Sequence, residues 1–133
     1  MIIASIDPGL IHTGIALKRY CGNICYGIFL ATFEGEKIFP IITKISRLAS
    51  EVVIERMPSN LDYPLSMMVT RIRQNLRDAK ITQISPGTWK PYCKARGLKN
   101  VSFAKTQHEK DAFLMLEYYL LFYRGRIKNE KFT

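Results

Sequence analysis

Three carboxylates and one imidazole stand at positions where they could share a metal site. Asp7 ends the first apolar segment of the chain, and Glu55 ends a second one. Both segments have the pattern of buried strands, and a carboxylate at the end of such a strand is costly unless it is paired or binds a metal. His108 and Asp111 open an apolar helical segment, and because they are three residues apart they share one face of that helix.

Together these four side chains predict a two-metal phosphodiesterase. In such a site two divalent cations polarise the phosphate, activate the attacking water and stabilise the leaving 3′-oxygen. Carboxylate oxygens favour Mg²⁺, two ions per site, with Mn²⁺ as a substitute. Each residue alone has an ordinary structural explanation, such as capping a turn or ending a helix. The set as a whole is better explained by metal binding, so Asp7, Glu55, His108 and Asp111 are the predicted catalytic metal ligands.

Local signals around these residues predict how they are presented. Thr106 and Glu109 have the spacing of a capping box, which gives Glu109 a structural role and leaves His108 and Asp111 free. Gly9 and Gly14 bracket the turn after Asp7, and their missing side chains would let an anion approach the backbone there. The chain shows neither a Ser-His-Asp nor a Cys-His arrangement, and no P-loop.

The strands and helices that must position these residues are predicted from the spacing of apolar residues and from turn-forming residues. Three antiparallel strands are expected over 2–7, 13–20 and 24–32, a helix over 40–50 and a strand over 51–55 parallel to the first. A helix over 62–79, a strand over 81–84, a helix opening at Pro86 after Ser85, and a helix from 107 to about 123 complete the chain. The prediction is a single α/β domain over 1–133, a mixed five-stranded sheet flanked by helices, in which Asp7 and Glu55 are neighbours.

The positive charge of the chain is concentrated in one region. The net charge is +9, and residues 71–110 carry ten basic against two acidic side chains. Basic charge beside a carboxylate cluster favours nucleic acid as the partner. The alternative is that the basic residues form a solvated surface with no role in binding. Trp89 is expected either to anchor the core or to stack beside DNA. The predicted DNA-binding residues are Arg73, Arg77, Lys90, Lys94, Arg96, Lys99 and Lys105.

The cysteines and the apolar segments bear on the compartment. Cys21, Cys25 and Cys93 are odd in number and lack metal-type pairing, which favours a reducing intracellular compartment: cytoplasm or nucleoid, or a host cell for a viral source. The longest apolar helical segment is too short to cross a membrane, and no cleavable leader precedes the first strand. No membrane partner is expected.

Several short motifs, in their order along the chain, resemble the RuvC family of Holliday-junction resolvases within the RNase H-like superfamily. They are Ile6-Asp7-Pro8-Gly9 with Thr13-Gly14, Ile54-Glu55, Pro86 with Trp89-Lys90, and His108-Glu109-Lys110-Asp111-Ala112. The resemblance implies an RNase H-like fold, a homodimer, and magnesium-dependent paired nicking of four-way DNA junctions in recombination and repair. It maps the metal-binding acids onto Asp7, Glu55 and Asp111, with His108 at a position held by aspartate or histidine. It also gives Lys90 a role in phosphate contact or charge stabilisation.

This chain departs from the family at two points. Its crossover over 33–51 is short, and Met57-Pro58 stand where members often carry an aromatic residue, so Tyr63 or no residue would serve at the junction centre. Two alternatives therefore stand beside the resolvase. One is an RNase H-like nuclease for other branched DNA or for RNA:DNA hybrids, and the other is an inactive DNA-binding module. The apolar excess on the helix over 62–79 favours a dimer, and hence the junction.

Overall fold

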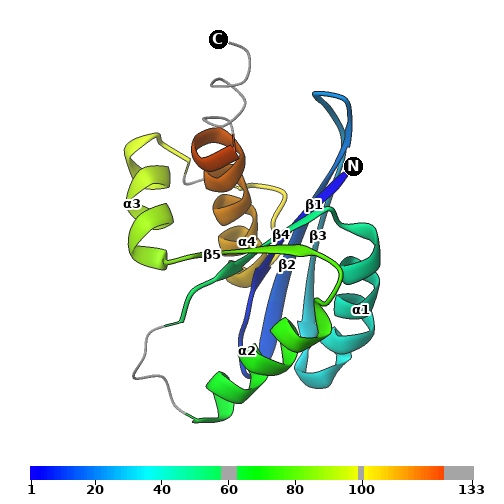
Figure 1. Ribbon diagram of the computed structural model, residues 1–133. Helices are drawn as coiled ribbons and strands as arrows, with labels where there is room; N and C mark the ends of the chain where they lie inside the picture. Colours follow the sequence, from blue (N-terminus) through cyan, green and yellow to red (C-terminus); the bar gives the residue numbers. More distant parts are fainter. Residues whose placement is uncertain (58–62, 99–100, 125–133) are drawn as a thin grey trace.

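A five-stranded mixed sheet forms the centre of the molecule (Figure 1). The structure is a computed structural model that describes residues 1–57, 63–98 and 101–124. The strands lie in the order β3-β2-β1-β4-β5, with β1 antiparallel to β2 and parallel to β4. This confirms the predicted α/β fold class with three antiparallel N-terminal strands and two parallel ones. The strands are β1 (Ile2–Asp7), β2 (His12–Cys21), β3 (Ile24–Glu34), β4 (Glu51–Glu55) and β5 (Lys80–Ile84).

In the part of the chain that the structure describes, four α-helices flank the sheet, α1 and α2 on one face and α3 and α4 on the other (Figure 1). A short 3-10 turn, η1 (Gly35–Lys37), precedes α1, and a π-helical segment, η2 (Tyr119–Arg124), continues α4. Within the described residues no helix has the length and apolar character of a membrane span. The helices are α1 (Ile38–Leu48), α2 (Tyr63–Asn75), α3 (Pro86–Ala95) and α4 (Gln107–Tyr118).

Helix α2 is shorter than its apolar periodicity predicts. It ends at Asn75, and Leu76 N donates to Arg73 O at 3.1 Å, a tighter turn that closes the helix. Asp78 N then donates to Ser46 Oγ of α1 at 3.0 Å, which turns the chain toward β5. Leu76 and Ala79 still pack against the core from this irregular segment. Their spacing therefore predicted correctly that they are buried, and predicted wrongly that they lie in the helix.

Alternation along β1 divides its side chains between two cores. Ala4 and Ile6 belong to the core that also contains α1 and α2, whereas Ile3 belongs to the core with α3 and α4. Since successive side chains of a strand point to opposite faces, Asp7 lies on the same face as Ile3. Strand β4 follows the same rule, because Val53 packs with α3 and α4 and Glu55 shares its face. Both carboxylates therefore face α3 and α4.

Gly14 has a different role from the one expected. A Cβ at Gly14 would lie 2.3 Å from the backbone oxygen of His108, so the first turn of α4 already occupies the space above this residue. A Cβ at Gly9 would meet His12 O at 2.0 Å within the turn itself. The expectation that these glycines open a path for an anion was wrong: they allow close backbone packing around Asp7.

Candidate active site

Asp7 and Glu55 end adjacent parallel strands. Ile6 pairs with Ile54 in the β1–β4 register, so the next residue of β1 and of β4 is a carboxylate. The pKa of Asp7 is raised to about 7, mainly because the carboxyl is buried and also because the negative charges of Glu55 and Asp111 lie nearby, and the hydrogen bond with His108 opposes the rise. A buried acid repelled by two others is typical of a functional site, because it is stabilised when a cation neutralises the cluster.

The first turn of α4 carries His108 to Asp7. Thr106 is the N-cap, and its Oγ1 accepts from Glu109 N at 3.1 Å. Glu109 is 5% exposed, and its carboxylate accepts from Lys105 N, one residue before the N-cap, and from the Thr32 hydroxyl. The Thr106 half of the predicted capping box is therefore present, whereas the Glu109 carboxylate reaches the backbone of Lys105 and not that of Thr106. His108 is left free, and its Nδ1 lies 3.2 Å from Asp7 Oδ2.

Asp111 lies one turn further along α4. Its charge acts on both Asp7 and Glu55, whose pKa values it raises. Gln107 Nε2 donates to Asp111 Oδ1 at 2.7 Å, which holds the carboxylate along the helix surface. A metal ion would therefore compete with this amide for Asp111 Oδ1.

Glu55 is contacted from α3. Trp89 Nε1 donates to Glu55 Oε2 at 3.1 Å. Burial raises the pKa of Glu55, and the Trp89 hydrogen bond and the positive charge of Lys90 oppose that rise. Of the two predicted roles for Trp89, the structure supports the core anchor, because the side chain is 2% exposed.

The donor types fit divalent cations, although the side chains do not already surround one. In the described part of the chain no three His, Cys, Asp or Glu side chains are placed to hold a single ion. Two of the acids are engaged elsewhere, Asp111 by Gln107 and Glu55 by Trp89. Three carboxylates within electrostatic range and one imidazole nevertheless form the hard-ligand set that Mg²⁺ or Mn²⁺ would use.

A basic groove lies between α3 and α4, and Asp111 is one of the residues that line it. Its volume is about 490 Å³. Trp89, Leu98 and Leu114 contribute its apolar part. Three lysines line it: Lys90 and Lys94, both predicted to bind DNA, and Lys110, which the prediction missed. The groove therefore joins positive charge directly to the acidic cluster.

The other predicted DNA-binding residues are dispersed. The Arg96 guanidinium lies 4.7 Å from the Tyr92 ring at the end of α3, and Lys105 precedes α4. Arg73 is in the last turn of α2, on the opposite face of the sheet, where the Gln83 amide oxygen can accept from its Nε at 3.2 Å. Arg77 follows α2 on that side and is exposed. Lys99 lies outside the described residues.

Sequence reasoning also missed one neighbour of the cluster, His12, and one contact of a residue that it had singled out, Trp89. The exposed His12 ring lies 6.0 Å from the His108 ring, between centroids. Its place just before Thr13-Gly14, directly after the turn that follows Asp7, was the available signal. The Trp89–Glu55 hydrogen bond had no such signal, because it joins residues of different elements through the fold.

Sheet order, strand directions and flanking helices together match an RNase H-like fold. Solved structures share it: T. thermophilus RuvC in complex with Holliday junction substrate matches with a TM-score of 0.64 and 16% identity, covering 90% of this chain and 94% of that chain. The fowlpox virus Holliday junction resolvase matches with a TM-score of 0.60 and 17% identity, covering 90% and 97%. No family model and no curated protein matches the sequence. The resemblance to RuvC is thus confirmed at the level of the fold.

Proposed function

We propose that the protein is a magnesium-dependent endonuclease that resolves four-way DNA junctions. The observation that carries the proposal is the acidic cluster of Asp7, Glu55 and Asp111 beside a lysine-lined groove to which Asp111 contributes, on a fold shared with two junction resolvases. A binding protein gains nothing from buried carboxylates that repel phosphate, whereas a metal-dependent nuclease requires them.

In the proposed mechanism Asp7, Glu55, His108 and Asp111 would hold two Mg²⁺ ions, and the bound ions would supply polarisation of the phosphate and activation of water. Asp7 is the central acid of the cluster, because it ends the middle strand of the sheet and the charges of both Glu55 and Asp111 raise its pKa. When Asp7 is ionised, His108 Nδ1 donates to it, and the imidazole Nε2 keeps its lone pair for a metal. The positive charge of Lys90 opposes the rise in the pKa of Glu55, which supports a position near the acids, and in the proposal Lys90 contacts the phosphate.

The groove between α3 and α4 would hold the DNA strand next to the scissile phosphate. Lys90, Lys94 and Lys110 line it, and their ammonium groups match the charge of successive phosphates. Arg96 and Lys105 extend positive charge from the ends of the same two helices. Arg73 and Arg77 would contact DNA where the arms of a branched substrate reach the α2 side.

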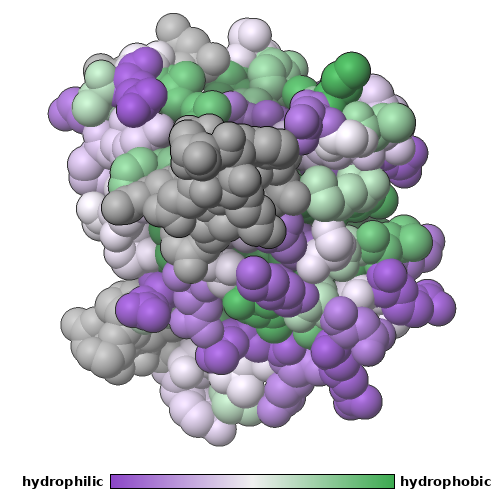
Figure 2. All heavy atoms as spheres, turned by 45° about the horizontal axis from the view of Figure 1, so that its top comes forward, coloured by the Kyte–Doolittle hydropathy of each residue, from purple (hydrophilic) through white to green (hydrophobic). Residues whose placement is uncertain are grey.

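Paired cleavage of a symmetric junction requires two active sites, so the proposal includes a homodimer. The predicted apolar excess on α2 is reduced by the fold, because Met68 is 8% exposed and faces the core. Tyr63 and Met67 remain exposed on α2, at 75% and 42%. The face drawn in Figure 2 carries separate apolar patches among hydrophilic side chains. An intracellular, reducing location is proposed as well.

The test is cleavage of labelled synthetic DNA in Mg²⁺, comparing an immobile four-way junction with a Y-fork, linear duplex, single strand and RNA:DNA hybrid. Symmetric nicks in opposing strands of the junction, abolished by Asp7→Asn, are expected. Equal cleavage of forks or hybrids would keep the metal mechanism and replace junction resolution by the broader nuclease. Absence of cleavage in both Mg²⁺ and Mn²⁺ would favour the inactive DNA-binding module.

A further inference from the structure

The chain contains one tryptophan, and it donates a hydrogen bond to a proposed metal ligand. Trp89 is 2% exposed, and its indole Nε1 lies 3.1 Å from Glu55 Oε2. Among the described residues no other hydrogen bond to the Glu55 carboxylate is found. One oxygen of Glu55 is thus fixed by a neutral donor, and Oε1 is left for another partner.

The fold brings these two residues together through the end of β5. Glu55 pairs with Ile84 in the β4–β5 register, and Arg56 N donates to Ile84 O at 2.8 Å. Ser85 then occupies the N-cap position of α3, so Trp89 lies in the first turn of that helix, directly after the strand that flanks Glu55. Because its ring packs in the core between the sheet and α4, the indole has little freedom to turn away.

A neutral donor suits this position better than a cation would. An arginine or lysine buried against Glu55 would neutralise the carboxylate and compete with a metal ion for it. The indole N–H orients the carboxylate and leaves its negative charge available. The positive charge nearby belongs to Lys90, whose Nζ lies 5.4 Å from the Trp89 ring centroid at the exposed end of the groove.

We propose that Trp89 is a positioning residue that orients Glu55 for metal binding through its indole N–H, so that Glu55 binds the ion mainly through Oε1. The inference rests on the proposed metal site and deepens it. A residue that only filled the core would need the ring and not the N–H. Trp89→Phe separates these roles, since phenylalanine keeps an aromatic ring in the core and removes the donor.

The first experiment observes the wild-type chain by NMR with ¹⁵N-labelled tryptophan, which gives a single indole N–H signal. Saturating Mg²⁺ is expected to shift this signal, because a metal on Glu55 draws charge from the acceptor oxygen. Mn²⁺ is expected to broaden it. In Glu55→Gln the indole still has an acceptor oxygen, but the Mg²⁺-induced shift should be lost.

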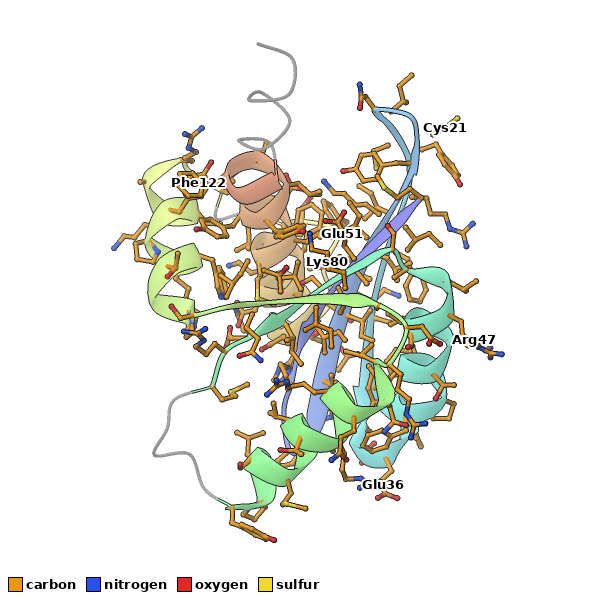
Figure 3. The ribbon with its side chains drawn as sticks, in the orientation of Figure 1. Cys21, Glu36, Arg47, Glu51, Lys80 and Phe122 are labelled. Atoms are coloured by element: carbon orange, nitrogen blue, oxygen red, sulfur yellow. The ribbon has the colours of Figure 1, made fainter. Side chains whose placement is uncertain are left out.

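The second experiment measures Mn²⁺ affinity from the free-ion EPR signal. Trp89→Phe is expected to weaken binding about tenfold, as loss of an outer partner of a metal ligand typically does. In the Glu55→Gln background the same substitution should have no further effect. The matched control is Tyr119→Phe, which removes the buried hydroxyl that donates to Glu51 Oε1 at 2.5 Å. Glu51, labelled in Figure 3, begins β4 and so lies at the opposite end of the strand from Glu55.

The outcomes separate this inference from the proposed function. Wild-type Mn²⁺ binding with an unmoved indole signal, and unchanged affinity in Trp89→Phe, would overturn the role of Trp89 and leave the metal site standing. No Mn²⁺ binding by the wild type would overturn both. If Trp89→Phe does not fold, the wild-type indole signal decides alone, since a core anchor with no link to the metal predicts no Mg²⁺ shift.

Discussion

Gly14 of β2 lies directly beneath the backbone of His108 in α4. A Cβ on Gly14 would be 2.3 Å from His108 O and 2.5 Å from its carbonyl carbon. Gly14 also pairs with Asp7 across the β1–β2 ladder. The close contact between Gly14 and the His108 backbone therefore determines the distance between Asp7 and the first turn of α4, which carries His108 and Asp111.

Gly14→Ala is expected to displace α4 and disable the site. Overpacking of this kind costs about 1–3 kcal/mol of stability, and it should also weaken Mn²⁺ binding, because two proposed ligands move with α4. Chemical denaturation and Mn²⁺ titration measure the two effects. Gly27→Ala is the control, since a Cβ there would meet the Arg19 side chain at an ordinary 3.6 Å. Equal losses in both variants would contradict the argument.

Asp7→Asn is expected to stabilise the metal-free protein at pH 8. The folded-state pKa of Asp7 is raised from 3.8 to about 7, so its contribution to stability is fully present below pH 3.8 and is lost as pH rises through about 7. At pH 8 the wild type holds a buried, repelled carboxylate that the variant lacks. Thermal unfolding in chelator should show a Tm gain for the variant at pH 8, on the order of 5 °C, and little difference at pH 4.

Added Mg²⁺ supplies the check on the Asp7 interpretation. At pH 8 the ion should raise the Tm of the wild type and leave that of Asp7→Asn nearly unchanged, because ligand binding stabilises only a fold that binds it. A variant less stable than the wild type at pH 8 in chelator would show that the Asp7 carboxylate has a structural role, and would contradict its assignment as a metal ligand.

Two acids of α4, separated by one residue, should behave in opposite ways. Glu109→Gln should lower the free energy of unfolding by about 1 kcal/mol, since Glu109 accepts the Lys105 N–H and the Thr32 hydroxyl at the helix start, and should keep Mn²⁺ affinity. Asp111→Asn should keep stability and lose Mn²⁺ affinity. Denaturation curves and EPR titration distinguish them, and a loss of metal binding in Glu109→Gln at unchanged stability would reverse the two roles.

The acids and the sheet were predictable because local patterns determine them. The apolar segments that end in Asp7 and Glu55 predicted buried strands, and parallel pairing of these strands then placed the two carboxylates side by side. Thr106 with Glu109 identified the start of α4. The features that the sequence did not predict depend on contacts between elements. They are the Ser46 hydroxyl that meets the chain after α2, the α4 backbone above Gly14, and the indole that reaches Glu55. Lys110 was missed because the groove exists only once α3 and α4 are side by side.

Lys94→Ala is expected to weaken DNA binding and to flatten its salt dependence. Loss of one phosphate contact should lower the slope of log affinity against log salt by about 0.9. Fluorescence anisotropy with a labelled junction, in chelator to prevent cleavage, measures the slope. Arg47→Ala is the matched control, because Arg47 lies on α1, on the opposite face of the sheet (Figure 3). A similar fall in slope for both variants would indicate a response to net charge and not a contact in the groove.

Met67→Lys is expected to convert a dimer to a monomer. Tyr63 and Met67 are four residues apart on the exposed face of α2, where a second copy could cover them about a two-fold axis. Light scattering should give twice the 15.3 kDa chain mass for the wild type and the single mass for the variant. Ile28→Lys tests a second exposed apolar surface, on the edge strand β3, where Ile28 is 52% exposed. If Ile28→Lys alone gave the monomer, the interface would lie along β3, and a monomeric wild type would remove the basis for paired cleavage.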